Sequence, residues 1–260
     1  MAMERKQMSE TEHILFSEPK VQQFRDADAD GAIGMRAYLN YFQDAVATWM
    51  HRLHWGNDTV HEQYGVAWVF MRYRMQVLAK TTYHEPLTIE CWMEPAGHTI
   101  SIRHAVEIRM GGQLMARGRL ESCLVDLANK RVTRLERIDF RPEVALDREN
   151  AVAPFDRIPM ETEGLREAYP YTVRYSDLDN NRHMTNLRYI QLVMDAFKPE
   201  EFQGKMLSDL EIHYRNQCLY GEQIRMLRGE EEGGHRILAL KEDGAPAICA
   251  KVRFADSVIV

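Results

Sequence analysis

Residues 177–183 read Asp177-Leu178-Asp179-Asn180-Asn181-Arg182-His183, the densest cluster of acid, amide and imidazole groups in the chain. The apolar residues after it recur at spacings of three and four, the pattern of a buried helix face: Leu187, Ile190, Val193, Met194 and Phe197. Thr185 is a suitable N-cap for this helix. We therefore expect His183 within about one turn of a helix N-terminus, where unpaired backbone N–H groups favour negative charge. This local chemistry suits the hydrolysis of a carbonyl compound.

The same order of features occurs once earlier in the chain. Arg25-Asp26-Ala27-Asp28-Ala29-Asp30 precedes a helix predicted over residues 36–53, as Arg174-Tyr175-Ser176-Asp177-Leu178-Asp179 precedes the second helix. Alternating strand patterns follow each helix, at residues 69–77, 87–93, 100–108 and 114–126, and at 210–217, 223–228, 237–241 and 247–254, with a further strand at 171–175. The chain is thus predicted to be a tandem α+β repeat, one long helix on an antiparallel meander in each copy. The first copy has Asp30-Gly31-Ala32-Ile33-Gly34 in place of the polar cluster, so we expect one catalytic half.

Composition excludes several classes of protein. The chain has 260 residues, is 45% hydrophobic and 28% charged, and contains no run near the roughly 18 apolar residues of a membrane span. The N-terminus lacks the apolar core of a signal peptide, so we expect a cytoplasmic location. A formal net charge of −6 with mixed signs gives no case for nucleic-acid binding. Widely spaced cysteines predict free thiols and neither a zinc site nor disulfides: Cys91, Cys123, Cys218 and Cys249.

Two sets of motifs resemble a known family. Asp177-Leu178-Asp179, Asn181 and His183 are followed by Asn186, Tyr189 and Ile190, and the first half has Leu39-x-Tyr41-Phe42-Gln43-Asp44-Ala45, Trp68-Val69-x-x-Arg72 and Arg131-x-x-Arg134. Over about residues 20–258 the chain resembles the fatty acyl-acyl carrier protein (ACP) thioesterases of plants and bacteria. The resemblance implies a tandem double hotdog of class α+β, each half a long central helix wrapped by an antiparallel β-sheet. It implies an N-terminal extension (1–20), a non-catalytic hotdog on the acyl-pocket side (21–140), a linker (141–168) and a catalytic hotdog (169–260).

The same resemblance implies a reaction and a catalytic set. The reaction is hydrolysis of the thioester that joins a fatty acyl chain to the phosphopantetheine arm of acyl carrier protein, which ends chain elongation without a cofactor or metal. The family's catalytic set falls on Asp179, Asn181 and His183. The plant proteins have Glu-Cys on a later strand, where this chain has Gln217-Cys218. Glutamine can orient water but cannot accept a proton as a carboxylate does, so we expect the base to be His183 or Asp179.

Each candidate has a role that its chemistry allows. His183 is suited to activating water near neutral pH, and Asn181 can hold that water or the thioester carbonyl. Cys218 ranks below them, because a nucleophilic thiol needs an adjacent base. Trp49 and Met50 are predicted core residues of the first helix, with a second interpretation in which they also line the acyl pocket.

Other interpretations remain open at the level of sequence. The chain could be another hotdog enzyme, an acyl-CoA hydrolase or a hydroxyacyl dehydratase, or a non-catalytic acyl-binding protein, which Gln217 would favour. Carrier proteins are acidic, so a docking surface should be basic, with Arg72, Arg74, Arg215 and Arg225 as candidate contributors. A homodimer is compatible with the sequence. The run Asp26-x-Asp28-x-Asp30-Gly31 mimics the start of a calcium loop, but Ala37 occupies the position that requires glutamate.

Overall fold

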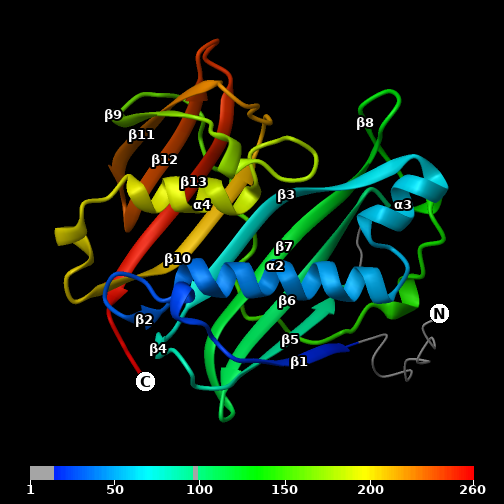
Figure 1. Ribbon diagram of the computed structural model, residues 1–260, viewed down its shortest axis with the longest axis horizontal. Coiled ribbons are helices and arrows are strands. Elements are labelled where there is room, and N and C mark those ends of the chain that lie inside the picture. Colours follow the sequence, from blue (N-terminus) through cyan, green and yellow to red (C-terminus); the bar gives the residue numbers. More distant parts are fainter. Residues whose placement is uncertain (1–14, 96–98) are drawn as a thin grey trace.

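The computed structural model describes residues 15–95 and 99–260 (Figure 1). The first half contains helices α2 (Met35–Arg52) and α3 (Asn57–Tyr64) and strands β1 (Leu15–Lys20), β2 (Ala32–Ile33), β3 (Val66–Val77), β4 (Thr81–Thr82), β5 (Leu87–Met93), β6 (Ser101–Met110), β7 (Gln113–Asp126) and β8 (Arg131–Thr133). The second half contains helix α4 (Asn186–Asp195) and strands β9 (Arg166–Thr172), β10 (Lys205–Tyr214), β11 (Gln223–Glu231), β12 (Gly234–Lys241) and β13 (Pro246–Asp256). Short 3-10 helices are η1 (Phe24–Asp26), η2 (Leu135–Arg137), η3 (Pro142–Val144), η4 (Tyr175–Asp177) and η5 (Pro199–Phe202).

The two halves share one antiparallel sheet. Within the described residues its path is β1-β5-β6-β7-β3-β10-β13-β12-β11-β9, with β8 paired to β7, and β2 and β4 pair separately. Strands β3 and β10 pair with each other and join the halves at a seam. Outward from this seam the strands are β3-β7-β6-β5-β1 in the first half and β10-β13-β12-β11-β9 in the second, which is the same order relative to the helix of each half. Helices α2 and α4 are in contact with each other, as Figure 1 shows. The predicted α+β tandem double hotdog is confirmed.

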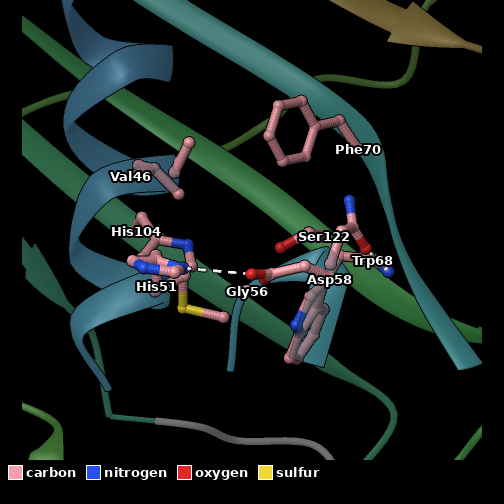
Figure 2. Close-up of a pocket in the computed structure, with 11 residues that line it drawn as sticks. Val46, His51, Gly56, Asp58, Trp68, Phe70, His104 and Ser122 are labelled. Atoms are coloured by element: carbon pink, nitrogen blue, oxygen red, sulfur yellow. Dashed lines mark hydrogen bonds and ion pairs between the residues drawn. The ribbon is translucent and has the colours of Figure 1, made fainter. Parts of the chain in front are cut away.

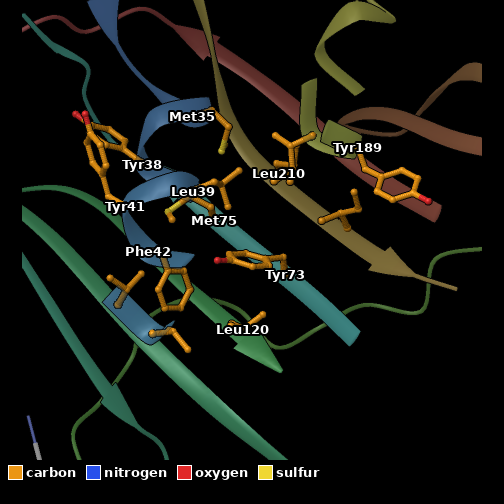
Figure 3. Close-up of a cluster of buried hydrophobic side chains, with 14 of the residues drawn as sticks. Met35, Tyr38, Leu39, Tyr41, Phe42, Tyr73, Met75, Leu120, Tyr189 and Leu210 are labelled. Carbon is orange, nitrogen blue, oxygen red and sulfur yellow. The ribbon is translucent and has the colours of Figure 1, made fainter. Parts of the chain in front are cut away.

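Helix α2 is buried on the face that the sequence pattern predicted. Tyr38, Leu39, Phe42 and Trp49 are fully buried. Phe42 packs edge-on against Tyr73 of β3 with ring centroids 5.3 Å apart, and Leu120 of β7 belongs to the same hydrophobic cluster (Figure 3). The same hydrophobic cluster continues through Leu210 of β10 to Tyr189 of α4. One apolar core therefore runs through both halves, which stabilises their relative placement.

Some elements were predicted wrongly or missed. The strand predicted at residues 171–175 ends at Thr172 and begins at Arg166, because β9 pairs with β11 as an edge strand with exposed, weakly alternating side chains. Strand β10 stops at Tyr214, three residues before the predicted end, since the backbone N–H groups of Arg215 and Asn216 both donate to the carbonyl of Ala247. Helix α3 was missed because Val60 is its one buried residue, which leaves no apolar stripe to detect.

The segment predicted as an N-terminal extension, residues 1–20, contains a strand at its end. Residues 1–14 lie outside the described part of the chain, but Leu15–Lys20 form β1, which pairs with β5 and buries Phe16. The segment between the halves crosses the outer face of the sheet, opposite the helices. Arg119 and Arg74 donate to the carbonyls of Val152 and Pro154, and the buried Ile158 packs on apolar side chains of the outer face, so both kinds of contact hold the segment there. Among the described residues, no helix combines the length and apolarity needed to cross a membrane.

Candidate active site

Asp177 anchors the polar loop that leads into α4. Its carboxylate is buried and accepts hydrogen bonds from the Tyr171 hydroxyl (2.7 Å) and the Arg174 backbone N–H (2.7 Å). The guanidinium of Arg188, in the first turn of α4, forms an ion pair with its other oxygen at 3.1 Å. This anchoring role was missed in the sequence, where Asp177 is only one more acid of the cluster. The sequence feature that could have indicated this role is the presence of Tyr171 before the loop and Arg188 after it.

Asp179 organises the turn that carries the other two predicted catalytic residues. Its Oδ1 accepts hydrogen bonds from the backbone N–H groups of Asn181 (2.8 Å) and His183 (3.2 Å). Its own N–H donates to the carbonyl of His183 at 2.8 Å, and Arg182 inside the turn has a φ of 62°. A non-glycine residue in this left-handed region is strained, so the surrounding bonds must hold it there. The Asp179 carboxylate therefore stabilises the conformation of the loop that carries Asn181 and His183.

The segment from Gln217 to Leu219 forms the second wall of this site. His183 pairs with Leu219 in an isolated antiparallel bridge, and the N–H of Met184 donates to the carbonyl of Cys218 at 2.9 Å. The Gln217 side chain is exposed beside this pairing. The structure therefore brings the Asp179–His183 loop and the Gln217-Cys218 segment, which lie far apart in sequence, next to each other.

A carboxylate near this wall was not among the predicted residues. Glu222 Oε2 accepts a hydrogen bond from the backbone N–H of Leu219 (3.0 Å) and forms an ion pair with Lys241 Nζ at 3.0 Å. Lys241 also donates to the carbonyl of Gln217 at 3.1 Å. These bonds stabilise the 217–222 turn. Sequence gave no signal for Glu222, because Lys241 comes from a strand of the sheet.

Backbone N–H groups at the start of α4 are candidates for stabilising an oxyanion, but some of them already have acceptors. The backbone N–H groups of Met184 and Thr185 already donate to the carbonyls of Cys218 and Asp177. The Thr185 side chain caps the helix by accepting from the N–H of Arg188. The first-turn N–H groups of Asn186 and Leu187 are left, and groups at this position have no intrahelical acceptor. They are the donors available for a developing negative charge.

Cys218 has the wrong environment for a nucleophile. Its side chain is fully buried, and burial raises the pKa of its thiol. A hydrogen bond with Tyr189 and the charge of Lys241 act in the opposite direction but are smaller effects. Because the thiolate is the reactive form, a buried thiol with a raised pKa is a packing residue.

The internal repeat holds, but its register differs by two residues from the one the sequence suggested. Asp26 and Asp177 each end a short 3-10 helix, and Gly31 and Arg182 share positive φ values of 79° and 62°. The counterparts of Asp179, Asn181 and His183 are therefore Asp28, Asp30 and Ala32. The predicted match of Asp30 to Asp179 was wrong, because two alternating acids can be aligned in more than one way.

In the first half, Lys80 lies beside the loop that corresponds to the Asp179–His183 loop of the second half. Ala32 of β2 pairs with Thr82 of β4, as its counterpart His183 pairs with Leu219. Thr82 therefore corresponds to Leu219, and Lys80, two residues earlier, corresponds to Gln217. Lys80 is buried, and its Nζ lies 2.7 Å from Asp30 and 3.3 Å from Asp28. Arg36 forms a further ion pair with Asp28 at 3.4 Å, so two cations balance the two acids, and the imidazole is replaced by the Ala32 methyl. The first half keeps the loop geometry without the catalytic groups.

The predicted acyl-pocket residues lie at a cavity of about 250 Å³ beneath the C-terminal turns of α2 (Figure 2). Met50 is part of its lining. Trp49 is fully buried and packs edge-on against His104, one of the lining residues, with ring centroids 5.8 Å apart. Met50 can thus contact a ligand directly, whereas Trp49 acts through His104.

One of the predicted docking arginines is wrongly assigned. Arg74 is buried on the outer face of the sheet, where it forms ion pairs with Glu211 at 3.0 Å and Asp209 at 3.2 Å across the β3–β10 seam. A side chain in this position cannot meet a partner. Arg225 is exposed and pairs only loosely with Glu167 at 3.7 Å.

Both halves of the chain match models of one protein family. Residues 16–140 match the acyl-ACP thioesterase N-terminal domain, and residues 161–255 match the acyl-ACP thioesterase C-terminal domain. Among curated proteins, a chloroplastic dodecanoyl-[acyl-carrier-protein] hydrolase of Cinnamomum camphora is 23% identical over 202 residues, which cover 72% of this chain and 52% of the relative. The equally named protein of Umbellularia californica is 24% identical over 224 residues, 79% of this chain and 58% of the relative. The chain spans about half the length of these relatives.

Solved structures share the fold across nearly the whole chain. An acyl-ACP thioesterase of Bacteroides thetaiotaomicron superposes with a TM-score of 0.86 at 19% identity, covering 95% of this chain and 100% of the other. The 12:0-ACP thioesterase of Umbellularia californica superposes with a TM-score of 0.80 at 18% identity, covering 94% and 98%. At such low identity these likenesses establish the double-hotdog architecture.

Proposed function

Because the chain belongs to the acyl-ACP thioesterase family, we propose that it hydrolyses fatty acyl-ACP to a free fatty acid and the carrier protein. The observation that carries this proposal is the match of both halves to the family's two domains, together with a polar loop that has its full set of groups in the second half alone. The reaction ends chain elongation in fatty acid biosynthesis. It is the reaction named for the curated relatives.

His183 is the proposed general base. It removes a proton from a water molecule whose oxygen then bonds to the thioester carbonyl carbon. Asn181 holds the water or the carbonyl through its amide, while Asp179 keeps both residues in place through its backbone hydrogen bonds. The tetrahedral oxyanion lies at the first-turn N–H groups of α4. When the C–S bond breaks, the phosphopantetheine sulfur leaves as a thiolate and takes the proton from His183.

The first half is proposed to bind the acyl chain, with Met50 in contact with it and Trp49 supporting His104. Lys80 supports this division, since together with Arg36 it balances the acids of the equivalent loop. Gln217 is proposed to orient water by hydrogen bonds, and Cys218 to be a packing residue. Cytoplasmic location and homodimer formation stay predictions.

The test is hydrolysis of acyl-ACP and acyl-CoA thioesters of graded chain length, followed through the released thiol. His183→Ala and Asn181→Ala should each lower kcat/KM by about 10²–10⁴-fold, the contribution of a positioned acid–base group. Asn180→Ala is the matched control, because this exposed neighbour is outside the proposed set. Wild-type turnover in both variants would remove the assignment, and thiol release from CoA but not ACP would identify an acyl-CoA hydrolase.

A further inference from the structure

His104 is a buried imidazole without a partner. Its side chain is 0% exposed on the helix-covered face of β6, and within the described residues neither ring nitrogen has a hydrogen-bond partner. Burial lowers the pKa of His104 to about 3, so the ring is neutral at pH 7. A neutral imidazole offers one N–H donor and one acceptor. Leaving both unused in an apolar interior costs roughly 1–3 kcal/mol per group, which calls for a partner that is not part of the chain.

A second polar group lies on the neighbouring strand. The register of β6 and β7 pairs His104 with Leu120 and Ile102 with Ser122, so Ser122 is diagonal to His104 on the same face. Diagonal neighbours across strands are close enough for their side chains to share one ligand. Ser122 is only 2% exposed. The two form a polar pair on a face that is otherwise apolar.

This polar pair belongs to the lining of the cavity of about 250 Å³. The other walls are mainly apolar and come from α2 and β3: Val46, Ala47, Met50, Trp68 and Phe70. Trp68 donates its indole N–H to the carbonyl of Trp55 at 2.7 Å, so this polar group is already satisfied. Figure 2 shows His104 and Ser122 on the sheet side of this space, and the exposed ion pair of His51 and Asp58 (3.3 Å) beside it.

The volume and lining define what could bind. A space of about 250 Å³ is below the roughly 300–1,000 Å³ of a pocket for a complete small molecule, so it suits one part of a longer ligand. Apolar walls suit methylene groups, and the polar pair suits an oxygen set among them. The cavity lies under the last turns of α2 in the first half, whereas the polar loop precedes α4 in the second. In an acyl chain that reaches from the polar loop into this cavity, the oxygen would lie in the distal part of the chain.

We propose that this cavity receives the distal part of an acyl chain that carries a hydroxyl or keto oxygen, which hydrogen-bonds to His104 and Ser122. The proposal rests on the proposed function and names its substrate class. A hydroxyl satisfies the donor or the acceptor of the imidazole, and a keto oxygen satisfies the donor. An unsubstituted chain would leave both nitrogens of His104 unpaired.

The test compares pairs of acyl-ACP substrates of equal length, one unsubstituted and one with a hydroxyl at successive positions from C3 to the chain end. Wild-type protein should prefer one distal hydroxyl position by about three- to ten-fold in kcat/KM, the effect of one net neutral hydrogen bond. His104→Leu should abolish that preference and Ser122→Ala should reduce it. His104→Gln, which keeps a donor and an acceptor, should restore part of it. His61→Ala, an exposed residue of α3 outside the lining, is the control and should keep the preference.

The outcomes separate this proposal from the proposed function. Equal rates for every pair, or a preference that survives in His104→Leu, would overturn the oxygen site and assign the cavity's polar pair to water alone. Release of thiol from none of the thioesters would instead count against the proposed function. In that case the free hydroxy and unsubstituted fatty acids are compared by calorimetry, where tighter binding of the hydroxy acid, lost in His104→Leu, supports the site and equal binding rejects it.

Discussion

Two residues at equivalent positions just after a strand explain much of the difference between the halves. Gln217 and Lys80 both follow the strand that joins the halves, and both lie beside the loop that precedes a helix. Lys80 reaches Asp28 and Asp30, the counterparts of Asp179 and Asn181. A side chain at position 217 is therefore within reach of the same two loop positions. Glutamine is neutral there and leaves the loop open to water and substrate.

The substitution Gln217→Lys should convert the second half into a copy of the first. The new ammonium would form an ion pair with Asp179, compete with the loop's backbone hydrogen bonds and lower kcat/KM by about 10²-fold or more. Hydrolysis of acyl-ACP measures this effect. Gln217→Glu should keep at least wild-type activity. Tyr220→Lys adds the same charge at an exposed neighbouring position and should have little effect; similar losses in both lysine variants would show that charge alone is responsible.

Cys218→Ala tests the role of the thiol. Because the thiol is buried and its pKa is raised, the variant should retain kcat/KM within about three-fold. Thiol release from acyl-ACP is the measurement, with circular dichroism to show that the fold is intact. A well-folded variant that loses activity as completely as His183→Ala would make Cys218 a nucleophile after all.

At the scale of elements, the start of α4 determines where the site residues lie. The predicted helix is present but ends at Asp195, two residues before Phe197, and Thr185 is its N-cap as the sequence indicated. The cap and the Met184–Cys218 hydrogen bond fix the end of the loop, and the bonds of Asp177 fix its start. Helix α2, in contrast, begins after Gly34 without a side-chain cap, so its position depends on burial of its apolar face.

Thr185→Ala should lower the free energy of unfolding by about 0.5–1 kcal/mol. We expect the lower part of the usual range for caps, because the distance from the Arg188 nitrogen to Thr185 Oγ1 is 3.4 Å, close to the limit for a hydrogen bond. Urea unfolding measures the change. Thr185→Ser keeps the hydroxyl and should retain most of the stability, so an equal loss in the serine variant would point to the methyl group instead.

At the scale of the whole molecule, the β3–β10 seam makes the two halves one unit. Arg74 of β3 forms ion pairs with Asp209 and Glu211 of β10, and the buried Glu211 also accepts from His213 and from the Asp156 backbone of the crossing segment. Removing the arginine would leave buried carboxylates without their counter-charge.

Arg74→Met should therefore destabilise the protein by about 3–5 kcal/mol, as the loss of one partner of a buried ion pair does. Arg225→Met removes an exposed pair and should cost less than about 0.5 kcal/mol. Urea unfolding followed by tryptophan fluorescence and by circular dichroism should show one shared transition in the wild type. Two separate wild-type transitions, or equal midpoints for the two variants, would contradict a coupling role for the seam.

The class of fold, helices α2 and α4, most strands and the loop from Asp177 to His183 could be predicted from the sequence alone. These features depend on periodicity and on residues adjacent in the chain, which a single sequence displays. It also indicated the repeat, although alternating acids left the register of that repeat ambiguous.

Contacts between residues far apart in the chain could be identified from the folded structure alone. Four features depend on strand pairing between segments far apart in sequence: the ion pairs of Lys80 with Asp28 and Asp30, the position of Gln217 beside His183, the ion pairs of Arg74 across the seam, and the lack of a described partner for His104. Alternation within a strand says which face a side chain is on but not which strand lies beside it. For this reason the loop could be recognised from the sequence, whereas its second wall and the polar pair of His104 and Ser122 could not.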